Sequence, residues 1–110
     1  MIAAEQAKAW FAQLMQTNSE AFDAGRYEVA YHALMASLHA AQDAGDGDLL
    51  RAVERTAEQQ QERIDADAPG HRLSSHEAKK HGAMGIFRMA ARQASARAAI
   101  VERERRNAEG

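Results

Sequence analysis

The clearest structural signal lies in residues 10–38, which read WFAQLMQTNSEAFDAGRYEVAYHALMASL. Apolar side chains recur there with the three- and four-residue spacing of one face of an α-helix. Gly25 interrupts the pattern, and glycine directly after such a segment indicates a helix end, because it adopts the left-handed conformation at little cost. The stretch predicts two helices, over about residues 3–24 and 27–44. Because only two or three residues join them, we expect an antiparallel hairpin.

Each helix of this hairpin has a predicted apolar face. For the first helix the face consists of Ala7, Trp10, Phe11, Leu14, Ala21 and Phe22. For the second it consists of Tyr27, Ala30, Tyr31, Leu34, Leu38 and Ala41. Most of the large apolar side chains of the chain gather here, so we expect the hairpin to be a self-sufficient core.

A third helix is predicted over residues 48–66. Gly45 ends the helix before it, and Asp46 or Gly47 caps its start. Pro69 restricts the residue before it to extended conformations, so the helix ends shortly upstream. Its narrow apolar face consists of Leu49, Leu50, Val53, Ala57 and Ile64. On the outer side we expect two ion pairs at i, i+3 spacing, Arg51 with Glu54 and Arg55 with Glu58, within a solvated acidic face.

A long fourth helix is predicted over residues 75–106. It starts at a capping box, in which Ser74 and Glu77 satisfy free backbone amides reciprocally. Gly82 and Gly85 are its weak point, because each costs about 1 kcal/mol relative to alanine inside a helix. They mark either a break or a close approach of a neighbouring helix, and the prediction takes the helix as continuous.

A continuous fourth helix has a consequence for assembly. At 1.5 Å per residue it spans roughly 48 Å, so its C-terminal turns extend beyond a bundle made with the other three helices. The apolar face continues along that extension at Ala90, Ala94, Ala98 and Val101. An apolar face without an internal partner is best covered by a second copy of the chain, so we expect a homodimer.

Composition supports the helical prediction. The 110 residues include 26 alanines, against 24 larger apolar residues, one proline and no cysteine. Alanine is the strongest helix former, and the few β-branched residues argue against a sandwich or barrel. The absence of cysteine excludes a disulfide scaffold, a thiolate metal site and a cysteine nucleophile. We expect one all-α domain over residues 1–110, bundle-like, without a membrane span and cytoplasmic.

The charge is unevenly distributed. Residues 1–70 hold 5 Lys/Arg against 12 Asp/Glu, a net charge of −7, whereas residues 71–110 hold 9 against 4, a net charge of +5. On a helical projection, four arginines of the last helix fall on a line opposite its apolar face: Arg88, Arg92, Arg103 and Arg106. This arginine stripe is predicted to face away from the acidic helices, and it is our candidate partner-binding surface.

Residues 14–46 resemble a single tetratricopeptide repeat hairpin. The second half of the repeat pattern is matched by Gly25, Tyr27, Ala30, Leu34 and Ser37, and its end by Ala41 and Gly45-Asp46. The first half departs from the pattern: Leu14 takes the place of the usual tryptophan, and Thr17, Asn18 and Ala21 replace leucine, glycine and tyrosine. The next repeat is not matched by Asp48, Arg51, Ala52 or Arg55. The resemblance implies a repeat-like helical hairpin with a protein-interaction role.

The five histidines do not form a metal site on helical geometry. His71, His76 and His81 lie five residues apart, so on a helix neighbouring members point about 140° away from each other. His32 and His39 share a face but lie roughly 10.5 Å apart along the axis, too far for one zinc ion.

A histidine phosphotransfer domain is a weaker alternative. His76 to Lys79 matches the start of its His-x-x-Lys-Gly motif, but Lys80 replaces the glycine. In the other register, from His81 to Gly85, Met84 replaces the lysine.

Taken together, these patterns predict a protein–protein interaction module that self-associates and docks a protein partner. We expect no enzyme activity, no catalytic residue, no cofactor and no metal. The alternative is a nucleic-acid-associated protein that uses the arginine stripe, since arginine suits phosphate contacts. The acidic first half, the pI near 6.2 and the absence of a recognition motif weigh against it.

Overall fold

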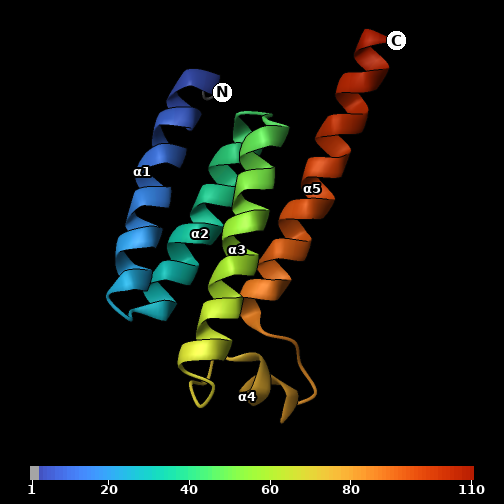
Figure 1. Ribbon diagram of the computed structural model, residues 1–110. Helices are drawn as coiled ribbons and strands as arrows, with labels where there is room; N and C mark the ends of the chain where they lie inside the picture. The colour runs from blue at the N-terminus through green and yellow to red at the C-terminus, as the bar shows by residue number, and fades with distance from the viewer. Residues whose placement is uncertain (1–2) are drawn as a thin grey trace.

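The computed structural model describes residues 3–110, and within them it shows five helices and no strand (Figure 1). The helices are α1 (Ala4–Asp23), α2 (Tyr27–Asp43), α3 (Gly47–Asp67), α4 (Ser75–Lys79) and α5 (Ile86–Glu109). The predicted all-α, bundle-like class is confirmed. None of these helices has both the length and the apolar character needed to span a membrane.

The first three helices lie close to their predicted bounds, and glycines end the first two. Gly25 has φ +76°, and the N–H of Arg26 donates to the carbonyl of Ala21 at 2.8 Å, which is the hydrogen bond of a Schellman cap. Gly45, with φ +63°, ends α2 in the same way. The sequence signal was reliable here because the cap is local to the turn.

The predicted continuous helix over residues 75–106 is wrong. The chain leaves the helix after five residues of α4, and it resumes helical structure only at Ile86. Gly82 takes the left-handed conformation, with φ +68°, and the N–H of Ala83 donates to the carbonyl of Ala78 at 3.0 Å. This closes α4 with the same cap that ends α1 and α2, so Gly82 is a helix end.

Gly85 marks the start of α5 through a contact with a helix far away in the sequence. A Cβ at Gly85 would lie 2.2 Å from Oε1 of Gln61, on α3, so no larger residue fits without a shift. That oxygen accepts hydrogen bonds from the N–H groups of Phe87 and Arg88, at 3.1 and 3.2 Å. The Gln61 side chain therefore caps α5 in the manner of an N-cap residue, although it belongs to another helix.

The break changes what covers the alanine face of the last helix. From its cap at Gln61, α5 runs back antiparallel along α3, as Figure 1 shows. Ala90, Ala94 and Ala98 are consequently buried within the chain. The expectation that this face needs a second copy to cover it is wrong.

The core is shared by both halves of the chain. α1 packs along α2, α3 packs along α5, and α2 joins the two pairs by packing on α3. Phe87 of α5 is fully buried, with its ring centroid 6.0 Å from that of Phe22 and 5.7 Å from that of Tyr31. The first hairpin is therefore not a self-sufficient core. Trp10, expected on its apolar face, is 40% exposed.

A pair of buried amides links the first three helices. Asn18 of α1 and Gln60 of α3 exchange two hydrogen bonds, at 2.7 and 3.0 Å, and Asn18 also donates to the carbonyl of Ala30 on α2 at 2.7 Å. Among residues 3–110 no buried side-chain polar atom lacks a partner. The amide pair therefore fixes the register of three helices without leaving a buried polar group unpaired.

Candidate interaction surface

The four arginines of the predicted stripe are exposed on α5. Within residues 3–110 none of their side chains makes an ion pair within 4.0 Å or a hydrogen bond. The other two arginines of α5 do have partners: Arg97 donates to Gln42, and Arg105 pairs with Glu109 at 3.5 Å. The guanidinium groups of the stripe are thus the ones on α5 that remain available to another molecule.

Arg88 and Arg92, the first two residues of the arginine stripe, do not face away from the acidic helices as predicted. Arg88 and Arg92 line a shallow groove of about 210 Å³ together with Glu54 and Glu58 of α3. Ala91, which is not part of the predicted apolar face, is buried, and it lies on the side of that face toward Arg88. The side of α5 that carries Arg88 therefore borders the acidic face of α3.

The carboxyl group of Asp65 on α3 has a pKa that is lowered by its neighbours, Arg88 among them. Burial alone would raise the pKa of its carboxyl group, but hydrogen bonds from the N–H and Oγ of Ser75, at 2.7 and 2.6 Å, and from Gln61 outweigh the effect. The positive charge of Arg88 acts in the same direction, so the pKa of Asp65 lies below its ordinary value. Asp65 thereby holds the start of α4 against α3.

An arginine–carboxylate network fixes the other end of α5 to α3. Arg51 binds both carboxylate oxygens of Glu102, at 3.0 and 2.8 Å, and also donates to Glu54 and Ser95. The hydrogen bonds with Glu102 and Glu54 raise the pKa of Arg51, and the hydrogen bond from Arg51 lowers the pKa of Glu102. The predicted Arg51–Glu54 pair is thus present at 2.9 Å.

The second predicted pair on α3, Arg55 with Glu58, does not come within 4.0 Å in the described part of the chain. Glu58 instead lines the groove beside Arg92. This difference leaves Arg55 as an exposed cation on the side of α3 away from the core.

Two large apolar side chains lie exposed beside the arginine stripe. Met89 is 55% exposed and Ile100 is 46% exposed. They are eleven residues apart on α5, which is three turns, so they lie along one line of the helix, with exposed Ala96 between them. The outer face of α5, defined by the arginine stripe together with Met89 and Ile100, therefore offers positive charge and apolar contact side by side.

The exposed positions of Met89 and Ile100 were not among the predictions from the sequence. The signal that could have found them is their angular position: both fall outside the apolar face of α5 although each is a large apolar residue. Both residues lie on one line of α5 beside the unpaired arginines.

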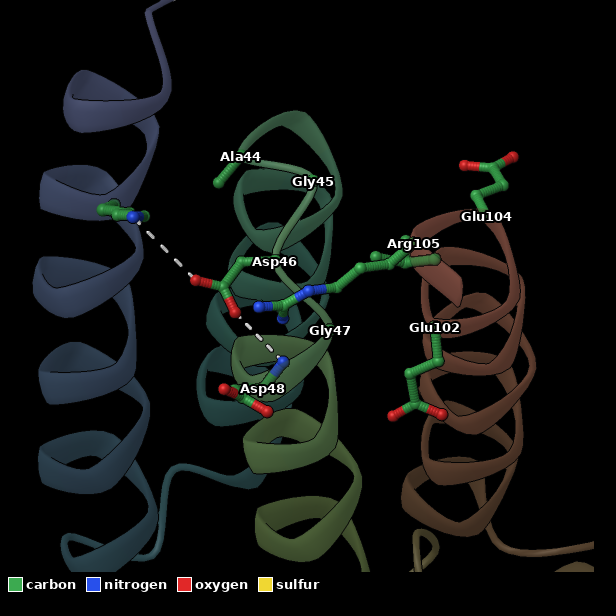
Figure 2. Close-up of a pocket in the computed structure, with 10 residues that line it drawn as sticks. Ala44, Gly45, Asp46, Gly47, Asp48, Glu102, Glu104 and Arg105 are labelled. Atoms are coloured by element: carbon green, nitrogen blue, oxygen red, sulfur yellow. Dashed lines mark hydrogen bonds and ion pairs between the residues drawn. The ribbon is translucent and has the colours of Figure 1, made fainter. Parts of the chain in front are cut away.

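A hollow lies at the end of the bundle where α5 passes the α2–α3 turn (Figure 2). This end groove has a volume of about 630 Å³ and is lined by Lys8, Ala44, Gly45, Asp46, Gly47, Asp48, Val101, Glu102, Glu104 and Arg105. Figure 2 shows the side chain of Arg105 extending from α5 toward the turn. The groove combines charges of both signs and contains no histidine.

The five histidines lie apart from one another. His32 and His39 lie on α2, and His76 lies on α4. His71 and His81 lie in the connections on either side of α4. His71 accepts a hydrogen bond from the N–H of Leu73 at 3.0 Å, and its ring packs on Tyr27. Within residues 3–110 no three histidine, cysteine, aspartate or glutamate side chains gather as metal ligands would.

Comparisons with known proteins add no relative. No protein-family model matches this sequence, and no curated protein or solved structure is significantly similar to it.

Proposed function

We propose that this chain is a small helical protein–protein interaction module that binds a protein partner on the outer face of α5. The observation that carries the proposal is the composition of that face, on which unpaired arginines adjoin Met89 and Ile100. A protein surface with carboxylates around apolar side chains complements both components. Charge complementarity then sets orientation and association rate, and apolar burial supplies affinity.

The charges around the stripe favour a protein over a nucleic acid. Glu54 and Glu58 share the groove with Arg88 and Arg92, so a ligand there meets both signs of charge. A nucleic acid presents a continuous negative backbone, which these carboxylates repel. A protein partner can place acidic groups against the arginines and a basic group against the glutamates.

Two further elements of the sequence analysis belong to this proposal. The likeness of residues 14–46 to one tetratricopeptide hairpin is in keeping with an interaction role, since that family binds other proteins. Self-association is the second element. The proposal assigns no catalytic step to the chain.

The test uses a synthetic helical peptide that carries leucines flanked by glutamates on one face, here called the acidic peptide. Binding is measured by fluorescence anisotropy for the acidic peptide and for generic DNA and RNA duplexes. We expect the acidic peptide to bind, more weakly as salt is raised, because exposed charges are screened. Binding of the duplexes without the peptide would support the nucleic-acid alternative, and binding of none of the probes would contradict the proposal.

Paired variants locate the binding surface. The substitution R88Q/R92Q removes two charges of the stripe and is expected to weaken acidic-peptide binding about tenfold, or about 1.4 kcal/mol. The control R26Q/R55Q removes the same charge from two exposed arginines outside α5. It should leave binding within about twofold, the size of a small change in net charge. Equal losses in both variants would show that only overall charge matters.

The phosphotransfer alternative makes a separate prediction. It requires a phosphohistidine at His76 or His81 after incubation with a phosphodonor kinase mixture. The structure places His76 on the five-residue helix α4 and His81 in the following connection, both exposed, so neither lies within a long bundle helix.

A further inference from the structure

A small pocket, here called the corner pocket, lies between α4 and the start of α5. It has a volume of about 220 Å³ and is lined by Ser75, Lys79, Ala83, Met84, Gly85 and Arg88. Its surface is almost wholly apolar. Figure 1 shows α4 at the end of the bundle where α5 begins. Because Arg88 also belongs to the arginine stripe, the corner pocket adjoins the outer face of α5.

Two of the residues that line the corner pocket are unpaired cations. Within residues 3–110, the side chains of Lys79 and Arg88 make no ion pair within 4.0 Å and no hydrogen bond. Glu77 pairs with Lys80 at 2.8 Å instead. The carboxylate of Asp65 attracts Arg88 without forming an ion pair, and its oxygens already accept hydrogen bonds within the chain. Both cations are exposed and available to a ligand.

The surroundings of the corner pocket carry a net positive charge. Residues 75–88 hold three Lys/Arg against one Asp/Glu, which gives +2 with neutral histidines. The six residues that line the pocket include no carboxylate, whereas Glu54 and Glu58 line the groove that Arg88 shares with Arg92. A ligand in the corner pocket therefore meets an apolar surface with cations beside it, and no carboxylate opposes a negative charge there.

The size of the corner pocket suits one side chain. Sites for drug-sized ligands have volumes of about 300–1,000 Å³, so this pocket is too small for such a ligand. In protein interfaces, a few large side chains that enter pockets carry much of the affinity. We propose that the corner pocket receives one large apolar side chain of the protein partner, and that carboxylates next to this side chain pair with Lys79 and Arg88. This inference rests on the proposed function and extends its binding surface from α5 to α4.

The first experiment compares two neighbouring lysines by fluorescence anisotropy with the acidic peptide. K79Q removes a cation that lines the corner pocket. K80Q is the matched control, because it removes the same charge from the next residue, which does not line the pocket. K79Q should weaken binding about fivefold, the upper range for an exposed ion pair. K80Q should weaken it less than about twofold, through net charge alone.

The second experiment tests whether an apolar side chain enters the pocket. A series of acidic peptides each has one leucine replaced by alanine. For one of these leucines, the replacement should weaken binding to the wild-type protein about tenfold, because a buried leucine is lost. With A83F, in which the added ring fills the pocket, the same replacement should cost less than about twofold. A12F, at an exposed position on α1, is the control and should retain the tenfold loss.

The outcomes separate this inference from the proposed function. Circular dichroism melts verify that each variant folds, and A83L replaces A83F if that protein does not fold. If the wild-type protein binds the acidic peptide, equal losses in K79Q and K80Q overturn the corner-pocket assignment, and so do leucine losses that are the same in A83F and in the wild type. Binding on the outer face of α5 stands in both cases. If the wild-type protein does not bind the acidic peptide, the proposed function fails and the corner-pocket assignment fails with it.

Discussion

The side-chain oxygen of Gln61 accepts the N–H of Phe87 at 3.1 Å, so a residue of α3 provides the cap of α5. The amide nitrogen of Gln61 donates to Asp65 and to the carbonyl of Leu73, which leaves this fully buried side chain with partners on both sides. One glutamine thus joins the end of α3, the connection that follows it and the first turn of α5. The direction of the interaction surface depends on this contact.

Substitution of Gly85 by alanine should destabilise the protein by roughly 1–3 kcal/mol. The new Cβ would lie 2.2 Å from Oε1 of Gln61, so the cap of α5 must shift. Urea unfolding measures the change. G70A is the matched control, because a Cβ at Gly70 meets nothing within 4 Å and its φ is not left-handed. Equal effects of the two substitutions would refute the role of the close contact.

Replacement of Gln61 by alanine should cost about 2–4 kcal/mol in the free energy of unfolding. The variant loses a buried side chain and leaves the N–H groups of Phe87 and Arg88 without their acceptor. Q59A, at an exposed position on the same helix, should change stability by less than about 0.5 kcal/mol. Hydrogen exchange provides a second readout: the amide protons of Phe87 and Arg88 should exchange faster in Q61A and unchanged in Q59A. Slow exchange at both amides in Q61A would contradict the cap.

The buried amide pair predicts strong coupling between Asn18 and Gln60. N18L should destabilise the protein by about 1–3 kcal/mol, because the amide of Gln60 and the carbonyl of Ala30 lose a buried partner. N18L/Q60L should be less destabilised than the two single costs added together, since it removes both halves of the exchange. Thermal and urea unfolding of the four proteins complete a double-mutant cycle, and additive costs would contradict the pairing.

Stability should fall in acid partly through Asp65. Its folded pKa lies below the unfolded value of about 3.9, so its contribution is fully present above that pH and is lost as the pH falls through the folded pKa. Glu102 and Glu77, whose pKa values are also lowered, act in the same direction. D65N should be less stable at neutral pH and should lose less stability between pH 5 and about pH 2 than the wild type. Parallel pH profiles of the two proteins would rule out this contribution.

The helices of the first half could be predicted from the sequence because their signals are local. Gly25 and Gly45 follow periodic apolar segments, and each forms the cap that its position indicates. The break before α5 could not be predicted in the same way. The capping box and alanine content favour a long helix locally, whereas Gln61, 24 residues before Gly85, sets the actual start of α5.

The candidate surface was predicted in part. Its four arginines are exposed, but their direction follows from which face of α5 packs on α3, and this depends on the break at Gly82. Half of the predicted capping box forms: Oγ of Ser74 accepts the N–H of Glu77 at 3.1 Å. The reciprocal half is wrong, because the N–H of Ser74 donates to the carbonyl of His71 and the carboxylate of Glu77 pairs with Lys80. Asn18 on the apolar face of the first helix was an overlooked signal, because a polar residue there requires a buried partner.

The most direct test of the proposed function is amide chemical-shift mapping of the folded chain titrated with the acidic peptide. We expect the largest shifts along the outer face of α5, at Arg88, Met89, Arg92 and Ile100, with residues of α1 unchanged and with smaller shifts in R88Q/R92Q. Saturable shifts centred on another helix, or no shifts at a peptide concentration that saturates anisotropy, would contradict the assignment of this face as the partner-binding surface.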